Sequence, residues 1–360
     1  MTEMPRLSDP LEFASDNTSP AHPAVIEALA RANAGPAASY GADAIMEGLR
    51  DRVRAIFEAP EAAVYLVATG TAANALALAT HCPPWGAVYC HRNAHVEEDE
   101  CGAPEFFTGG AKLVLIDGDH ARMTPGGLDR ALRFTARAGV HNVQRGMLTL
   151  TNATENGTVY SPAEVAALTA LAGARGLPCH MDGARFANAL VSAGCTPAEM
   201  TWKAGIDVLS FGGTKNGLLG VEAVMLFDPA RAWEFELRRK RAGHLVSKHR
   251  YLSAQMAAYL EGDLWLANAA AANRAAARLS RGIAAVPGAR LDHPTQANAV
   301  FAAFPRAAHR RATEAGAHYY FWPADQPAEG PDDEPLSCRL VCSWNTTDAA
   351  VDRMIRLIAG

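Results

Sequence analysis

The stretch VLSFGGTKNGLL (residues 208–219) is the part of this chain that decides its fold. It begins as a short apolar run, which predicts a buried strand, and it continues into a glycine-rich turn that holds Lys215. Glycine lets the backbone turn tightly and lets a bulky ligand approach it. A solvated loop lysine needs no such neighbours, whereas an amine in a partly desolvated pocket can form a Schiff base. The stretch therefore predicts a strand end that carries a reactive lysine.

Similar apolar runs recur along the first two thirds of the chain and alternate with helical patterns. They show little alternation of apolar and polar residues, which is typical of parallel strands covered on both faces. The candidate strands are Ala63–Ala68, Ala87–Cys90, Leu113–Ile116, Met147–Thr151, Leu177–Met181, Val208–Phe211 and Ala223–Phe227. We expect an α/β fold with a seven-stranded, mostly parallel sheet and a ligand at the carboxyl ends of its strands.

The pattern changes after a long helical region around residues 230–285. Strands such as NAVFAAF (298–304) and CRLVCSW (338–344) then mix with helices, which predicts a small C-terminal α+β domain. We expect an N-terminal segment and a large domain over residues 1–245 and the small domain over 246–360, with the boundary between 235 and 285. A length of 360 residues agrees with one large and one small domain.

The composition excludes several classes of protein. A formal net charge of −5 does not favour a nucleic-acid partner. Seven cysteines without a CxxC pair indicate reduced thiols and no metal site. No signal-peptide pattern and no run of roughly 20 apolar residues is present, so we expect a cytoplasmic protein without a membrane partner. One basic cluster, residues 237–251, is either a solvated helix face or an anion site at a subunit contact.

Two further strand ends carry candidate ligand groups. VATGTAANALAL (67–78) places Gly70 and Thr71 at a strand-to-helix turn, where backbone N–H groups suit a phosphate; plain N-capping is the alternative. HMDGAR (180–185) places Asp182 at the end of a strand, where it can pair with a cationic ligand nitrogen. Its neighbour Arg185 can bind a carboxylate, unless the two form a salt bridge with each other.

These groups come in an order that has chemical meaning. A phosphate cradle, a strand-end aspartate and a lysine 33 residues later supply what a pyridoxal-phosphate enzyme needs. Upstream, HRNAHVEEDE (91–100) offers His91 or His95, which could stack on a planar cofactor or act as a base near neutral pH. The alternatives there are a helix cap or a metal site, with Glu97–Glu100 as a solvated acidic face.

Taken together, the motifs resemble the threonine aldolase family, which lies within the fold type I pyridoxal-phosphate enzymes and the β-eliminating lyase group. The most specific pieces are SDN, YGAD, TGTAAN, AHVEEDECGAPEFF, HMDGAR and SFGGTKNG, in the family's order. The resemblance implies a lyase that uses pyridoxal 5′-phosphate to cleave L-threonine, L-allo-threonine and related β-hydroxy-α-amino acids into glycine and an aldehyde. A phenylserine aldolase, or another pyridoxal-phosphate lyase or aminotransferase, is the implied alternative.

The resemblance also assigns the cofactor contacts. Lys215 matches the lysine that holds the cofactor covalently, and Asp182 matches the aspartate at its pyridine nitrogen. Gly70 and Thr71 match the phosphate-binding turn, and His95 matches the histidine that stacks on the ring.

The substrate contacts follow in the same way. Ser15, Arg185 and Arg339 match the groups that bind the substrate α-carboxylate, and Arg185 counts among the cofactor contacts as well. Tyr40 matches a tyrosine at the mouth of the site that comes from a neighbouring subunit. The family usually forms homotetramers, as dimers of dimers with shared active sites, and Lys240 of the basic cluster fits a role at the phosphate of the adjoining subunit.

The chain departs from the family at Glu155, where many members carry a histidine that contacts the substrate hydroxyl. The lysine motif is also GGTKNG rather than the commoner SKGLG. The base that takes the hydroxyl proton is therefore left open between His95, Glu155 and a water molecule between them. Catalysis is expected to involve Lys215, His95 and Glu155.

Overall fold

The computed structural model describes residues 10–327 and 329–360. The packing of the chain divides it into two compact units. One is Pro20–Leu266, and the other combines the described residues up to Ser19 with Ala267–Gly360. The expected domain boundary between residues 245 and 246, within the range 235–285, stays a prediction.

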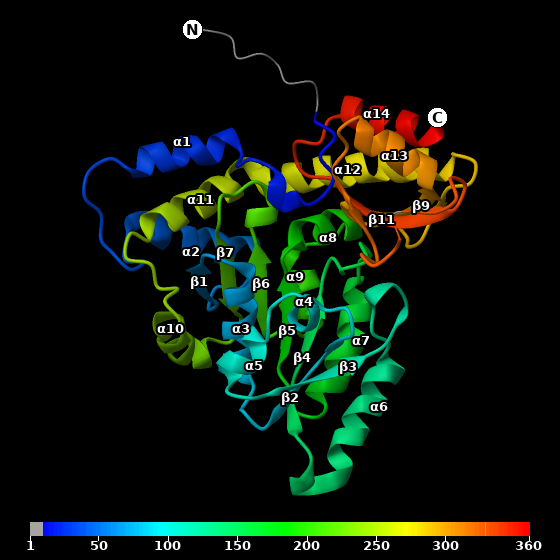
Figure 1. Cartoon of the computed structure of the whole chain (residues 1–360). Helices are drawn as coiled ribbons and strands as arrows, with labels where there is room; N and C mark the ends of the chain where they lie inside the picture. Colours follow the sequence, from blue (N-terminus) through cyan, green and yellow to red (C-terminus); the bar gives the residue numbers. More distant parts are fainter. Residues whose placement is uncertain (1–9, 328) are drawn as a thin grey trace. The chain divides into compact units, whose positions relative to one another are not determined.

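A seven-stranded sheet forms the centre of the Pro20–Leu266 unit (Figure 1). Its strands, in the order β1-β7-β6-β5-β4-β2-β3, are β1 Ala63–Val67, β7 Glu222–Leu226, β6 Val208–Gly212, β5 Cys179–Gly183, β4 Gln144–Thr151, β2 Gly86–His91 and β3 Lys112–Ile116. Strands β2 to β6 pair in parallel, whereas β7 is antiparallel to both of its neighbours. Each strand overlaps its predicted position, so the expected α/β fold with a mostly parallel sheet is confirmed.

Helices alternate with these strands along the chain. They are α1 Pro23–Ala32, α2 Ala44–Ile56, α3 Gly70–His81, α4 His95–Glu98, α5 Ala103–Thr108, α6 Pro125–Thr135, α7 Pro162–Gly173, α8 Phe186–Ala193, α9 Pro197–Met200, α10 Ala232–Arg241 and α11 Arg250–Leu260. Local sequence sets where they begin. Asp43 accepts a hydrogen bond from the backbone of Met46 at the start of α2, and Ser161 and Glu164 form a capping box at the start of α7.

Helix α3 is buried along most of its length. Every residue from Ala72 to Thr80 is buried, and alanine side chains let the helix lie close to the sheet. A helix that is apolar on all sides belongs in the interior of a protein. Asn74 is therefore a polar side chain inside an apolar environment, and it needs hydrogen-bond partners there.

The second unit contains a smaller antiparallel sheet in the order β10-β11-β9-β8. Its elements are η1 Asp16–Thr18, most of α12 Leu264–Ala284, β8 Arg290–Leu291, β9 Ala299–Pro305, α13 Arg306–Glu314, β10 Tyr320–Phe321, β11 Pro335–Val341 and α14 Asp348–Ala359. The N-terminal segment joins this unit, because the backbone N–H of Phe13 donates to His318 O and that of Val341 donates to Phe13 O, both at 2.8 Å. Within the described ranges, no helix is long and apolar enough to cross a membrane.

Candidate active site

Lys215 lies on a short 3-10 turn, η5 (Thr214–Asn216), directly after strand β6. The neighbouring strand β7 fixes this turn. The backbone N–H of Gly213 donates to Glu222 Oε2 at 2.6 Å, and the backbone N–H of Val221 donates to Thr214 Oγ1 at 3.2 Å. Glu222 is buried, and burial raises the pKa of its carboxyl group. The turn that carries Lys215 is thus anchored at the carboxyl end of β6.

Asn216 fixes the other side of the same turn. Its Nδ2 donates to the hydroxyl of Tyr259 at 2.7 Å and to the carbonyl of Trp265 at 2.9 Å. The Tyr259 hydroxyl donates in turn to Gly212 O at 3.2 Å. Buried polar groups therefore hold the turn on both sides of Lys215.

The glycines before the lysine are required by the protein's own packing. A Cβ atom on Gly212 would lie 2.3 Å from the carbonyl oxygen of Ala184, and one on Gly213 would lie 2.4 Å from Leu218 Cδ1. Such distances are far below normal contact. The sequence suggested that these glycines make room for a cofactor; the structure adds that the lysine turn packs directly against the backbone that follows Asp182.

Asp182 ends up as a buried anion next to this turn. It lies near the end of β5, where Oδ1 accepts from the backbone N–H of Ala184 at 2.9 Å and Oδ2 accepts from Asn74 Nδ2 at 2.8 Å. Burial raises the pKa of Asp182, but attraction to His95, the bond from Ala184 and the charge of Lys215 together outweigh it and lower that pKa. An ionised carboxylate at this edge suits a cationic ligand atom.

His95 begins helix α4 and pairs with a buried carboxylate. Its Nδ1 lies 2.8 Å from Glu100 Oε1, and this bond is the main reason that the pKa of His95 is raised. The Glu100 side chain has no exposed surface, whereas that of His95 is 33% exposed. The alternative of a solvated acidic face is therefore correct for Glu97 and Glu98 but wrong for Glu100.

Asn74 connects the two carboxylates. Its Nδ2 donates to Glu100 Oε1 as well as to Asp182 Oδ2, each at 2.8 Å. Sequence reasoning missed both Asn74 and Glu100. Asn74 could have been noticed as the one amide in the apolar helix sequence GTAANALALATH, whereas nothing in an acidic run marks which member is buried.

Glu155 follows strand β4 and contacts His95 through the backbone. Its Oε1 accepts from the backbone N–H of His95 at 2.8 Å, while Oε2 is buried without a partner among the described residues. Burial, with repulsion from Asp182, raises the pKa of Glu155 from its ordinary value of 4.5 to about 7. A carboxyl group with such a pKa can gain or lose a proton near neutrality.

Four of the predicted residues, Lys215, Asp182, His95 and Glu155, thus lie at or just after the carboxyl ends of strands in the Pro20–Leu266 unit. The charge of Lys215 lowers the pKa of both His95 and Asp182, which places the three groups within each other's electrostatic reach. Gly70 and Thr71 begin α3, where the first N–H groups of a helix lack intrahelical partners. The hydroxyl of Thr69, not that of Thr71, caps this helix by accepting from Ala72 N at 3.2 Å.

The remaining predicted residues lie in three places. Arg185 directly precedes α8, three residues after Asp182. Ser15 and Arg339 belong to the second unit, where Arg339 Nη2 donates to Ala14 O at 3.5 Å and the guanidinium lies 4.8 Å from the ring centre of Trp322. Their assigned roles stay predictions.

Tyr40 and Lys240 lie together on the Pro20–Leu266 unit. Lys240 Nζ stands 4.8 Å from the centre of the exposed Tyr40 ring. Within the basic cluster, however, Arg239 is buried and pairs with Glu236 at 2.8 Å. The interpretation of the cluster as a solvated helix face is therefore wrong for Arg239.

The donor set can be judged for metal binding. One ligand atom from each of His95, Glu100 and Asp182 lies within 4.8 Å of the others. The amide of Asn74 already bridges the two carboxylates, and Nδ1 of His95 is bonded to Glu100. We interpret this group as a hydrogen-bonded network and assign no metal to it.

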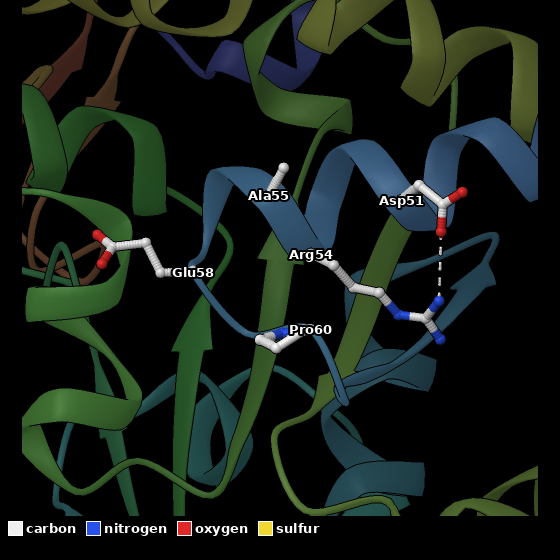
Figure 2. A pocket seen from close by; sticks show the side chains of 5 residues that line it. All are labelled: Asp51, Arg54, Ala55, Glu58 and Pro60. Carbon is white, nitrogen blue, oxygen red and sulfur yellow. Dashed lines mark hydrogen bonds and ion pairs between the residues drawn. The ribbon is translucent and has the colours of Figure 1, made fainter.

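A surface hollow of about 440 Å³ lies elsewhere, at the end of α2 (Figure 2). Its charged groups already have partners, since Arg54 Nη1 pairs with Asp51 at 3.4 Å and Glu58 pairs with Lys203 at 2.7 Å. Figure 2 shows the Asp51 and Arg54 side chains turned toward each other. Polar groups that converge on a ligand are not seen there, so this hollow is not the candidate site.

Comparison with known proteins gives consistent matches. Residues 12–305 match the Beta-eliminating lyase family. The low specificity L-threonine aldolase of Pseudomonas aeruginosa is 42% identical over 353 residues, which is 97% of this chain and 98% of the relative. That of Escherichia coli K12 is 30% identical over 191 residues, 53% and 55% of the two chains. The solved structure of Leishmania major threonine aldolase has a TM-score of 0.88 at 26% identity, covering 97% and 98%.

Proposed function

The chain belongs to the Beta-eliminating lyase family, and from this membership we propose that it is a pyridoxal-phosphate-dependent aldolase of the low-specificity L-threonine type. It cleaves L-threonine, L-allo-threonine and related β-hydroxy-α-amino acids into glycine and an aldehyde. Identity of 42% over nearly the full length of a relative that bears this name supports the proposal.

The observation that carries the proposal is the network around Asp182. A buried aspartate whose pKa is lowered, an imidazole bonded to a carboxylate and a lysine on a hydrogen-bonded turn lie within electrostatic reach of one another. This donor set fits pyridoxal phosphate: Asp182 suits the protonated pyridine nitrogen, Lys215 the aldehyde carbon, and the N-terminus of α3 at Gly70 and Thr71 the phosphate. When bound, the cofactor accepts the electrons of the bond that breaks at the substrate Cα.

The chain's own residues bind and orient the substrate and move protons. Arg185 and Arg339 bind the α-carboxylate, with Ser15 beside it, and so choose which bond is aligned for cleavage. Glu155 takes the proton of the β-hydroxyl, either directly or from His95. A group whose pKa is about 7 suits that step, because it is partly deprotonated at neutral pH and can still return the proton.

The proposal also covers where the protein acts and how its subunits assemble. The protein acts in the cytoplasm as a homotetramer, with Tyr40 and Lys240 of one subunit at the site of its neighbour. Tyr40 and Lys240 are exposed and lie against each other, which supports their availability to a neighbouring subunit. Light scattering of the purified protein measures the mass; a monomer would contradict the shared site.

The experiment that tests the activity measures products from several substrates. Incubation with L-threonine, L-allo-threonine and phenylserine is expected to release glycine with acetaldehyde or benzaldehyde, and Lys215→Ala is expected to release none. No aldehyde from any substrate would reject the aldolase. Cleavage of phenylserine alone would favour a phenylserine aldolase, and conversion of the cofactor to its pyridoxamine form, followed by its return on adding a 2-oxo acid, would favour an aminotransferase.

A further inference from the structure

We propose that Glu100 is a positioning residue that holds His95 in a single tautomer, with the proton on Nδ1 and the lone pair of Nε2 directed to the reaction. The inference rests on the proposed function and extends it by naming a residue that acts through another. Glu100 itself touches neither cofactor nor substrate in this scheme.

The hydrogen-bond chemistry fixes the tautomer. Glu100 Oε1 lies 2.8 Å from His95 Nδ1 and also accepts from Asn74 Nδ2 at 2.8 Å. Burial raises the pKa of Glu100, whereas the bonds from His95 and Asn74 act against burial and favour the ionised form. The ionised carboxylate has only acceptor sites, and with it the proton in the His95 contact is on Nδ1. In the neutral imidazole the remaining nitrogen, Nε2, then carries the lone pair and is the atom able to take a proton.

The imidazole is also held at its backbone. The N–H of His95 donates to Glu155 Oε1 at 2.8 Å, so one end of the residue is tied to Glu155 and the ring is tied to Glu100. Asn74 Nδ2 donates one hydrogen bond to each carboxylate and so links Glu100 to Asp182. Asp182, which suits the pyridine nitrogen, is therefore joined to the imidazole of His95 through the Asn74 amide and Glu100.

The burial of Glu100 at this position destabilises the folded state. Its side chain is fully buried, and Oε2 has no partner in the described part of the chain. A buried oxygen that lacks a hydrogen-bond partner destabilises the folded state. Stability alone does not favour such a residue, whereas a carboxylate that orients a catalytic histidine does explain it.

The charged groups around His95 determine in which direction its pKa should change. Glu100 and Asp182 raise its pKa, Lys215 and burial lower it, and the bond to Glu100 is the largest contribution. Glu155 contacts the backbone of His95, and Glu100 itself is faced by Asp182 and His95. Removal of the Glu100 charge should therefore lower the pKa of His95.

The first arm of the test needs no cofactor. In cofactor-free protein labelled with ¹³C-histidine, the pKa of His95 is followed by NMR, and His95→Asn identifies its signal. Glu100→Gln is expected to lower that pKa by about one unit or more, while Glu97→Gln, an exposed neighbour in the same run, leaves it unchanged. An unchanged His95 pKa in Glu100→Gln would overturn the proposal. If Glu100→Gln does not fold, Glu100→Asp decides it in the same way, with a smaller fall expected.

The second arm uses the loaded enzyme. In Glu100→Gln, kcat for threonine cleavage should fall roughly 10- to 100-fold with little change in KM, and the acidic limb of kcat/KM should move to lower pH. Glu100→Asp should restore part of kcat. A purely structural role would reduce the amount of folded enzyme without moving the limb, and that result would also overturn the proposal. Lack of cleavage by the wild-type protein would reject the proposed function instead, and the NMR arm would still decide the role of Glu100.

Discussion

Asp182 and Glu155 are both buried carboxylates of the site, and their pKa values move in opposite directions. Asp182 accepts from Asn74 and Ala184 and is faced by His95 and Lys215, so its charged form is favoured. For Glu155, burial and repulsion from Asp182 outweigh the hydrogen bonds that its carboxylate accepts, so its pKa is raised. Two carboxyl groups whose environments separate their pKa values suit different tasks, a fixed anion and a proton carrier.

The raised pKa of Glu155 predicts a pH effect on stability. Between its ordinary value of 4.5 and about 7, the folded cofactor-free protein binds more protons than the unfolded chain, so the free energy of unfolding falls as pH rises. In Glu155→Gln this contribution, at most about 3 kcal/mol, should be absent. Urea unfolding from about pH 5 to about pH 8 measures it; equal slopes in both proteins would show that Glu155 has an ordinary pKa.

The two bonds donated by Asn74 predict a stability effect at neutral pH. Asn74→Leu keeps the size of the side chain but removes the donor shared by Glu100 and Asp182. Two buried carboxylates then lose a partner, and we expect a loss of roughly 2–4 kcal/mol in the free energy of unfolding. Urea unfolding of the cofactor-free variant at neutral pH measures it, and a variant as stable as the wild type would contradict the bridging role.

At the scale of elements, apolar runs were enough to locate all seven strands of the large sheet, because strands covered on both faces are continuously hydrophobic. A continuously apolar run looks the same in a parallel and in an antiparallel strand, so the sequence did not show that β7 runs antiparallel to β6. The strand ends that carry Asp182 and Lys215 belong to the paired strands β5 and β6, and the roles assigned to the two residues stay predictions. The burial of Glu100 was not visible, because it depends on the position of α3 behind it.

The close contact between two of these elements gives a prediction for glycine. Gly212→Ala should destabilise the protein by roughly 1–3 kcal/mol, because the new methyl group would lie against the backbone of Ala184. Gly48→Ala is a matched control inside α2, with no atom within 4 Å of its Cβ position, and it should stabilise by about 0.5–1 kcal/mol. Thermal unfolding compares the two; equal effects would contradict the tight contact.

At the scale of the whole chain, the N-terminal segment is part of the C-terminal unit. Phe13 is fully buried in a core with residues of α12, β9 and β11, and its backbone bonds to His318 and Val341. Partners more than 300 residues apart leave no local pattern, so sequence periodicity could not show this pairing.

This pairing predicts that the segment stabilises the second unit. Phe13→Ala should lower the free energy of unfolding by about 3–5 kcal/mol, since it empties a core position. Phe134→Ala removes an exposed ring from α6 and should change it by less than about 0.5 kcal/mol. Urea unfolding of both variants measures the difference, and similar stabilities would show that the segment contributes little.

Lys215, on its anchored turn within electrostatic reach of Asp182, is the proposed covalent attachment point of pyridoxal phosphate. Borohydride reduction of the purified, cofactor-loaded protein, followed by mass spectrometry of its peptides, tests this most directly. The cofactor should be fixed on the peptide that contains Lys215 and on no other, and Lys215→Ala should carry none. Attachment to a different lysine, or none to the wild-type protein, would contradict it.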